Sequence, residues 1–317
     1  MALIKKWVLA TFILTFLVIL AGGIVRTTQS GMGCPDWPKC FGMWVPPTQA
    51  SQLPADFEQY LSVQDIDHSF NAFHTWVEYV NRLLGVLLGL FGIIQLLLIF
   101  PKRKQIPNAL NIAIAFLVLV IITGLFGAIV VKLNLAYLSI SVHLLFALIL
   151  TQVQLGLLMN VKGRLYKKTA GTKMRRTILI LLIIFIAQSI MGTAVRMYVD
   201  DVSKQLAYTQ REAWLATLPI IFIIHRSFSW LVLLAALVGF WQARKIPALK
   251  NTMRNILLLC LCSFTTGVIL YYLDMPAFAQ PLHLILAALT ITQTMFALLY
   301  TKNTTDLLKP QTFSSFT

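Results

Sequence analysis

Charged residues are scarce in this 317-residue chain, because Asp, Glu, Lys and Arg together make up only 12% of it. Ordinary soluble domains carry about 25% charged residues, roughly twice that share. Hydrophobic residues make up 58% of the chain, and the mean hydropathy is +0.78. The sequence also lacks a glycine-rich phosphate loop or a nucleotide-binding signature. These absences exclude an ordinary soluble domain and indicate a polytopic membrane protein.

Acidic residues are the scarcest charged type, with 11 Asp and Glu against 26 Lys and Arg, for a net charge of +15. Most of the basic residues lie at the chain ends and in the connections 101–108, 160–176 and 242–255, whereas every acidic residue except Asp306 lies elsewhere. The positive-inside rule places such basic segments in the cytoplasm. We therefore expect a multi-pass protein of the cell membrane with both termini cytoplasmic, in contact with the lipid bilayer and with no nucleic-acid partner.

Eight apolar segments have about the length needed to cross the hydrocarbon core as helices, roughly 20 residues each. They are 7–25, 75–100, 109–131, 136–159, 177–195, 218–241, 256–273 and 280–300. The first could instead be a signal peptide, because Lys5 and Lys6 precede an apolar run that ends in small residues. Its length and its resemblance to segment 177–195 favour a membrane span. The expected fold class is an all-α polytopic membrane protein with eight transmembrane helices.

The two halves of the chain repeat four landmarks in the same order: a Val-Arg pair, a proline, a glycine and a histidine. In the first half these landmarks are the pair that ends at Arg26, then Pro107, Gly127 and His143. In the second half they are the pair that ends at Arg196, then Pro247, Gly267 and His283. The proline and the histidine are 36 residues apart in both halves. We expect two pseudo-symmetric four-helix bundles, residues 1–160 and 161–317, related by an axis along the membrane normal.

Cysteine is also rare, with four in the chain, and two of them lie in the long extracytoplasmic loop 26–74. Cys34 and Cys40 stand in SGMGCPDWPKCFG, surrounded by proline and glycine. On the outer side of the membrane, such a pair predicts a disulfide-closed loop. A metal site is the alternative, although no second cysteine pair is near. Cys260 and Cys262 lie inside an apolar segment, where we interpret them as packing residues.

Ionisable side chains within an apolar segment are costly unless they have a partner or a function. Glu78, Asn81 and Arg82 lie in segment 75–100 at spacings that place them on neighbouring positions of one helix face. The equivalent stretch of the second half has Phe222, His225 and Arg226. The sequence therefore predicts that this face points into the protein in both halves, with an acid only in the first.

Three of the five histidines lie within apolar segments, each near the expected outer end: His143, His225 and His283. His225 and His283 lie in the second and fourth helices of one unit, an arrangement that suits two axial ligands of a haem. Zinc would need further ligands, and hydrogen-bonded core histidines are the other alternative. The first half keeps His143 and adds Glu78, which indicates one fixed cofactor site and one reaction site.

Several motifs together resemble the haem A synthase family over essentially the whole chain: the exit GGIVR, the loop GCPDWPKCFG, the segment EYVNR, the HR pair at 225–226 and the spaced histidines. The resemblance implies an oxidoreductase that converts the C8 methyl group of haem O to the formyl group of haem A for cytochrome oxidase assembly. It implies a haem b cofactor in the C-terminal half and the substrate haem in the N-terminal half.

By position, the resemblance implies that His225 and His283 bind the iron of haem b, that His143 binds the substrate haem iron, and that Glu78 is catalytic. Arg82 would reach a haem propionate or the membrane interface. Asn81 departs from the family, because many members have histidine there, in the pattern E-x-x-H-R. His74 is an alternative second ligand.

The resemblance also implies partners and a source of oxygen. The partners are a haem O synthase and cytochrome oxidase assembly factors, and the oxygen source is water. A homo-oligomer is compatible with the resemblance. Two other functions fit parts of the pattern. A non-catalytic dihaem b-type electron carrier would explain the histidines, and a transporter would explain the repeats. Glu78 and the missing histidine at Asn81 favour the enzyme.

Overall fold

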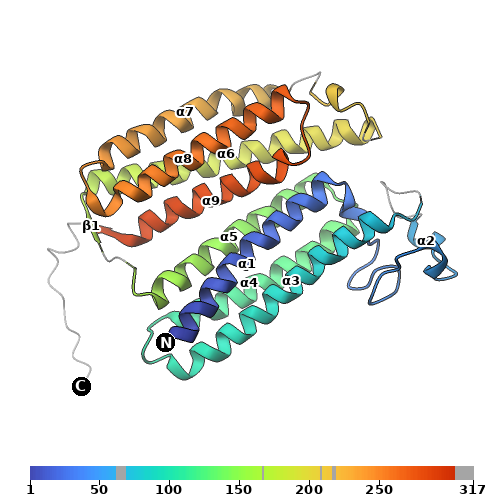
Figure 1. The fold of residues 1–317 in the computed structure, drawn as a ribbon, viewed down its shortest axis with the longest axis horizontal. Helices are drawn as coiled ribbons and strands as arrows, with labels where there is room; N and C mark the ends of the chain where they lie inside the picture. Colours follow the sequence, from blue (N-terminus) through green and yellow to red (C-terminus); the bar gives the residue numbers. More distant parts are fainter. Residues whose placement is uncertain (62–68, 166–167, 208, 216–218, 304–317) are drawn as a thin grey trace.

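Eight long helices dominate the protein in a computed structural model that describes residues 1–61, 69–165, 168–207, 209–215 and 219–303. All eight are long and apolar enough to cross a membrane, as the sequence predicts. They are α1 (Ala2–Thr27), α3 (Ala72–Ile99), α4 (Ala109–Lys132), α5 (Tyr137–Val161), α6 (Thr172–Gln205), α7 (Ile220–Ala243), α8 (Pro247–Tyr272) and α9 (Ala279–Tyr300). Figure 1 shows them running roughly parallel to one another.

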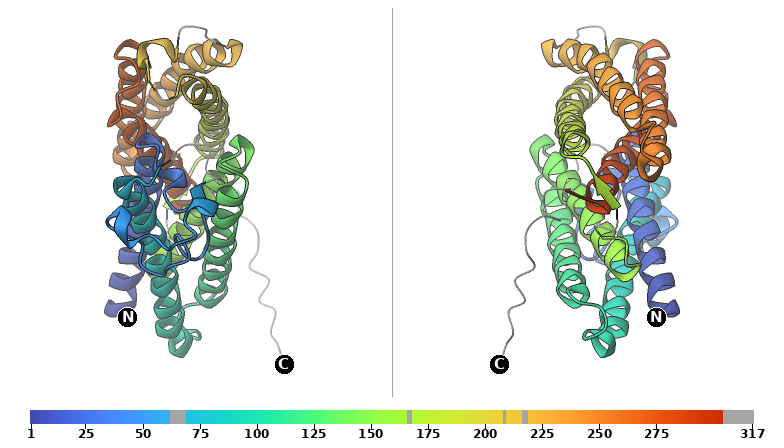
Figure 2. Two further views of the ribbon diagram at one scale, coloured as in Figure 1. Left: turned by 90° about the vertical axis from the view of Figure 1, so that its right-hand side faces the viewer. Right: turned by 90° about the vertical axis from the view of Figure 1, so that its left-hand side faces the viewer.

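The helices form two groups of four, drawn one above the other in Figure 1. In the first group α1 contacts α3, α3 contacts α4, α4 contacts α5, and α5 returns to α1. In the second, α6, α7, α8 and α9 contact one another in the same cyclic order. The groups meet where α9 packs against α1 and α5, and the end views in Figure 2 separate them clearly. Diagonal helices in each ring therefore face a common interior.

The helix surfaces follow the requirements of a bilayer. Large aliphatic side chains are exposed on the outer faces, including Ile121 and Leu125 of α4. Inside the first group, the Gln154 amide donates to Gln95 Oε1 over 2.8 Å and to the Val8 carbonyl over 3.1 Å. Buried amides need such partners, because no water is present to replace them. These bonds link α1, α3 and α5 at one level of the bundle.

Shorter elements lie in the connections. They are η1 (Ser30–Met32), η2 (Ala50–Gln52), α2 (Glu58–Leu61), η3 (Phe100–Lys102), η4 (Arg211–Ala213) and the strands β1 (Lys168–Ala170) and β2 (Thr301–Asn303). The two strands pair in parallel, and Ala170 lies opposite Asn303. The sequence does not predict this pair. It joins the start of α6 to the end of α9, where Arg175 also donates to the Leu298 carbonyl over 3.2 Å.

Two helix boundaries differ from the expected ones and affect the site. Helix α6 continues past Val195 to Gln205, so the first part of the expected outer loop is helical and places Arg196 and Asp200 one turn apart. Helix α3 begins at Ala72, where the Asn71 side chain accepts a hydrogen bond from the His74 amide over 3.2 Å. The chain start and β1 lie at one end of the helices, and α2 lies at the other (Figure 1). Cytoplasmic termini remain a prediction.

Candidate functional site

A cavity of about 800 Å³ lies between the helices of the first group, under the outer loop. This volume is typical of a site for a large organic ligand, since such pockets range over about 300–1,000 Å³. All four residues that the sequence assigns to the substrate pocket line it: Glu78, Asn81, Arg82 and His143. His74 is not among the described residues that line it. The structure therefore brings together side chains from α3 and α5 that are 61 or more positions apart in the sequence.

Glycines widen the cavity between α3 and α4. Gly85 and Gly89 of α3 and Gly124 and Gly127 of α4 all line it. A Cβ atom added at Gly85 or Gly124 would meet no described atom within 4 Å. The deeper wall is apolar and includes Ile19, Leu88, Val120 and Leu150. The space between these helices is thus open to a large and mostly apolar group.

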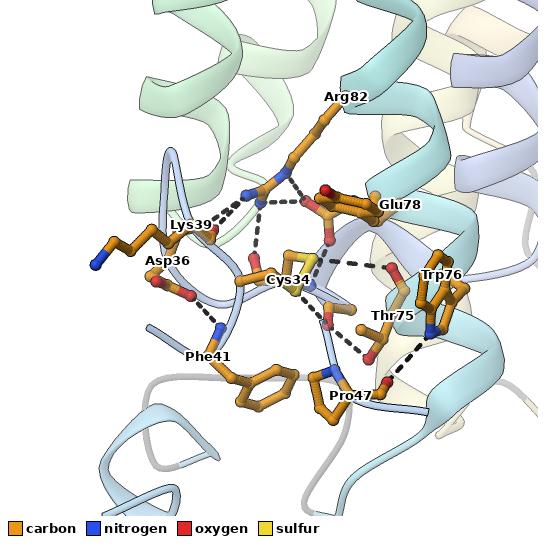
Figure 3. The surroundings of a disulfide bond; sticks show 12 residues. Cys34, Asp36, Lys39, Phe41, Pro47, Thr75, Trp76, Glu78 and Arg82 are labelled. Atoms are coloured by element: carbon orange, nitrogen blue, oxygen red, sulfur yellow. Dashed lines mark hydrogen bonds and ion pairs between the residues drawn. A yellow bond between two sulfur atoms is a disulfide. The ribbon is translucent and has the colours of Figure 1, made fainter. Parts of the chain in front are cut away.

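Glu78 lies at the outer end of the cavity, with only 4% of its surface exposed. Its Oε2 atom accepts a hydrogen bond from the Cys34 amide over 2.7 Å. Its Oε1 atom accepts from Arg82 Nη2 over 2.5 Å and from Nε over 3.1 Å. Figure 3 shows the carboxylate between the helix and the loop. Each contact is a donor to oxygen, which is the environment of an ionised carboxylate.

Arg82 binds the outer loop as well as Glu78. Its Nη1 atom donates to the Asp36 carbonyl over 2.6 Å and to the Lys39 carbonyl over 3.0 Å, and Nη2 donates to the Cys34 carbonyl over 2.8 Å. Together with the two bonds to Glu78, these occupy the five N–H donors of a guanidinium (Figure 3). A contact between Arg82 and a propionate stays a prediction, and it would require exchange of one of these bonds.

The loop approaches α3 closely because residue 33 is glycine. A Cβ atom at Gly33 would lie 2.2 Å from the His74 carbonyl oxygen, so a side chain there would push the loop away. The Gly33 carbonyl accepts from the Thr75 hydroxyl over 2.9 Å. Immediately afterwards, Cys34 is joined to Cys40 by a disulfide bond (Figure 3). This close approach brings the Cys34 amide within reach of Glu78.

The rest of the loop covers the outer end of the cavity. The Asp36 carboxylate accepts from the Phe41 amide over 2.6 Å and from the Gly42 amide over 3.0 Å, which closes the disulfide turn. Trp37 and Trp44 line the cavity, and the Trp44 carbonyl accepts from the Tyr79 hydroxyl over 2.6 Å. The loop thus forms an aromatic cover that is tied to α3 by hydrogen bonds.

Each intramembrane histidine lies against a glycine of the preceding helix. A Cβ atom at Gly127 would lie 3.4 Å from His143 Cε1. One at Gly192 would lie 3.2 Å from His225 Cε1, and one at Gly267 would lie 3.5 Å from His283 Cε1. The repeat spacing in the sequence singles out Gly127 and Gly267 but not Gly192. The glycines leave room for the imidazole side chains to extend into the interior of each group of four helices.

The contacts of His283 favour a proton on Nδ1. The Thr266 hydroxyl donates to the Ser263 carbonyl over 2.8 Å, so its oxygen is left to accept from His283 Nδ1 over 2.9 Å. With the proton on Nδ1, the lone pair of Nε2 is available for a metal. The buried Nδ1 atoms of His143 and His225 have no hydrogen-bond partner among the residues that the structure describes.

His225 and His283 lie on α7 and α9, which are diagonal in the second ring of helices. Two imidazoles on diagonal helices, each seated on a glycine, fit a haem between them better than a tetrahedral metal ion. Within the described ranges, no group of three or more His, Cys, Asp or Glu side chains could hold a metal ion. Ligation of a haem by this pair stays a prediction.

A charged cluster lies at the junction of the two groups, and the sequence does not predict it, although the Val-Arg repeat contains two of its members. Arg26 Nε donates to Asp200 Oδ2 over 3.0 Å, and Arg196 Nε lies 2.8 Å from Asp200 Oδ1. Arg196 also donates to Gln280 of α9. All four residues line the cavity. Two guanidinium groups share one carboxylate, so the cluster is net positive and suits an anionic ligand group.

Comparison with known proteins gives one family. The model of the cytochrome oxidase assembly protein family (COX15-CtaA) matches residues 5–295. A Heme A synthase of Shewanella oneidensis is 29% identical over 189 residues, which are 59% of this chain and 55% of the relative. A Heme A synthase of Flavobacterium psychrophilum is 24% identical over 328 residues, covering 92% of this chain and 96% of the relative.

The extent of these matches differs. The match to the Shewanella protein spans about half of that relative's length. A Heme A synthase of Ehrlichia ruminantium is 24% identical over 332 residues, covering 94% of this chain and 93% of the relative. The similarity thus includes both groups of helices and the outer loop.

Proposed function

The chain belongs to the COX15-CtaA family of cytochrome oxidase assembly proteins, and on that premise we propose that it is a membrane haem A synthase. It oxidises the C8 methyl group of haem O to a formyl group by successive hydroxylation, for assembly of cytochrome oxidase. One observation carries the proposal: a cavity of about 800 Å³ brings His143 and a buried carboxylate, Glu78, to one large and mainly apolar space.

The resident cofactor in this proposal is haem b, held by His225 and His283. When bound, it supplies one-electron transfer between the substrate site and an external acceptor. Each of the two imidazoles lies against a glycine, and His283 Nδ1 donates a hydrogen bond to Thr266; both features support these ligands. The residues of the chain orient both imidazoles and keep Nε2 of His283 free to coordinate.

The substrate site is the cavity of the first group. His143 coordinates the substrate iron, and the net positive Arg26, Arg196 and Asp200 cluster receives the propionates at the outer end. Glu78 stabilises positive charge that develops at the methyl carbon during oxidation, or accepts a proton from the attacking water, which is the proposed oxygen source. Both effects act on the transition state, so Glu78 is assigned to catalysis rather than to haem binding.

The proposal places the protein in the cell membrane with both termini cytoplasmic and the disulfide loop outside. Residues 1–160 form the substrate unit and residues 161–317 the cofactor unit. The partners of this reaction are the haem O synthase that supplies the substrate and the assembly factors that take up haem A. The basic connections between α3 and α4, α5 and α6, and α7 and α8 support this orientation.

The pigment of the purified full-length protein tests the function. We expect extraction and chromatography to yield haem B together with haem O, a hydroxylated intermediate or haem A. Equal amounts of haem B from two sites, with no other haem, would instead indicate a dihaem electron carrier. Protein that contains no haem would contradict both and leave a transporter. The Glu78→Gln variant provides the matched comparison, because it should keep haem B and lose haem A.

A further inference from the structure

Each group of four helices contains two pairs of helices in which a histidine of the second could lie against a glycine of the first. Three of these four pairs have such a contact. His143, His225 and His283 each lie against a glycine of the preceding helix, at 3.2–3.5 Å from a Cβ atom placed there. The three helix pairs are α4 with α5, α6 with α7, and α8 with α9. The remaining pair is α1 with α3, whose helices are also in contact.

Sequence landmarks identify the two residues of the fourth position. Gly192 precedes Arg196 by four residues, and Gly22 precedes Arg26 by the same distance. His225 directly precedes Arg226, and Asn81 directly precedes Arg82. Gly22 and Asn81 thus correspond to Gly192 and His225. The glycine of the fourth position is present, but a shorter amide replaces the imidazole that would lie against it. We call such a glycine, with the space beside it, a glycine seat.

The local structure at this position is open. A Cβ atom at Gly22 would meet no described atom within 4 Å, in contrast to the 3.2 Å contact at Gly192. Gly22 and Asn81 both line the cavity. The space that the His225 imidazole fills between α6 and α7 therefore has a counterpart between α1 and α3, and this counterpart is part of the cavity. Asn81 Oδ1 is buried and has no hydrogen-bond partner among the described residues. An unpaired buried amide oxygen indicates that a polar ligand is expected there.

The position also has the right relation to His143. Helices α3 and α5 are diagonal in the first ring, as α7 and α9 are in the second. Asn81 and His143 therefore occupy the places of the two axial ligands in the second ring. A ligand plane held by His143 would turn its other face toward Asn81 and Gly22.

We propose that the space between Gly22 and Asn81 is a binding site for a small exogenous ligand of the substrate haem iron, on the face opposite His143. The ligand class is a small neutral molecule that gives an electron pair to iron, such as water or carbon monoxide. A ligand with a proton, such as water, would donate a hydrogen bond to Asn81 Oδ1, whereas carbon monoxide would need only the open space. Steric access and hydrogen-bond donors on the distal side decide which small ligands a haem binds. The inference rests on the proposed function, because it assumes a haem in this cavity.

The probe is carbon monoxide, added to full-length protein in detergent that has been loaded with haem O and reduced with dithionite without oxygen. Optical difference spectra then report ligand binding without turnover. We expect one haem to bind carbon monoxide while the haem between His225 and His283 does not. Asn81→His should convert the substrate haem to a low-spin spectrum and abolish carbon monoxide binding. Asn81→Ala should leave the site open, so carbon monoxide, which has no proton to donate to the Asn81 oxygen, should still bind.

A second substitution tests the glycine seat itself. In the Asn81→His background, Gly22→Leu should occupy the seat, displace the introduced imidazole and restore a high-spin spectrum. Gly156→Leu is the matched control, because a Cβ atom at Gly156 of α5 also meets no described atom within 4 Å, but Gly156 is not among the described residues that line the cavity. This control should leave the low-spin spectrum of the Asn81→His protein unchanged.

Two results would overturn the inference. One is a wild-type substrate haem that is fully low-spin and binds no carbon monoxide; the other is unaltered carbon monoxide binding in Asn81→His. If the same preparations still produce haem A in air, the proposed function stands and only the small-ligand site is wrong. If the cavity takes up no haem O and no haem A is made, the proposed function fails and the inference fails with it.

Discussion

Helices α3 and α7 carry equivalent stretches, but the environments of their arginines differ. In α3, Arg82 forms an ion pair with Glu78 and donates to three carbonyls of the outer loop. In α7 the place of Glu78 is taken by Phe222, and the guanidinium of Arg226 lies 5.9 Å from the centre of that ring and 5.8 Å from the Tyr271 ring. One arginine is held by hydrogen bonds and the other by aromatic faces.

In the proposed function, this difference separates a reaction site from a cofactor site. The α3 stretch places a buried carboxylate and a hydrogen-bonded loop at one cavity, which the open Gly22 of α1 also lines. The α7 stretch places a histidine on an occupied glycine seat, beside aromatic packing. Charge that develops during a reaction is stabilised best by fixed polar groups in a dry site. A cofactor that is bound permanently needs ligands and packing instead, and the following experiments test that contrast.

The largest effect is expected from removing a proposed haem ligand in the second group of helices. His225→Ala or His283→Ala should delete one axial ligand of haem b, so the low-spin spectrum should be lost or converted and haem A production should cease. Absorption spectra of the purified variants measure this directly. If both variants retain a low-spin haem at full occupancy, these histidines are not the ligands.

On the α3 side, Glu78→Gln should abolish most haem A production while leaving haem in the protein. Glutamine has nearly the same size but cannot carry the negative charge, so transition-state stabilisation is lost whereas the cavity is kept. Chromatography of extracted haems should show haem O or the hydroxylated intermediate accumulating. Retention of the haem B spectrum is the control for folding, and a normal rate of haem A formation would leave Glu78 as a structural partner of Arg82.

A milder effect on the cofactor site is expected from Thr266→Val. The substitution keeps the shape but removes the oxygen that accepts from His283 Nδ1. Loss of such an outer partner typically costs about 10-fold to 100-fold in metal affinity. Haem B occupancy after dilution or competition with apomyoglobin should fall accordingly. Thr265→Val, one residue away with an exposed hydroxyl bonded to its own helix, is the matched control and should bind haem normally.

The smallest effect is expected from opening the loop disulfide. Cys34→Ser with Cys40→Ser removes the covalent closure, but the Asp36 and Arg82 hydrogen bonds to the loop remain. We expect a several-fold loss of haem A production, because Glu78 is held less firmly by the Cys34 amide. Mass spectrometry of alkylated, non-reduced wild-type protein should find the pair protected, and two alkylated thiols would contradict the bond. Cys262→Ser, at an exposed free cysteine, should have no effect.

The sequence predicted much of this architecture for simple reasons. A bilayer requires apolar runs of defined length with satisfied backbone groups, so the eight helices are visible in composition alone. Ionisable residues are rare in such runs, so Glu78 and the three histidines were conspicuous as candidates. The residues of the Arg26, Arg196 and Asp200 cluster were less visible, since arginine and aspartate near a helix end are ordinary features of a membrane boundary.

What the sequence determined by itself is the set of elements and the identity of the polar groups inside them, because local apolar length and residue type decide both. Only the tertiary structure decided which groups meet. Glu78 was expected beside Arg82, since helix spacing imposes that contact, but the Cys34 amide on Oε2 depends on a loop folding back over α3. The openness beside Gly22 likewise depends on how α1 and α3 pack. Contacts between distant segments arise from packing of the whole chain, which no local pattern records.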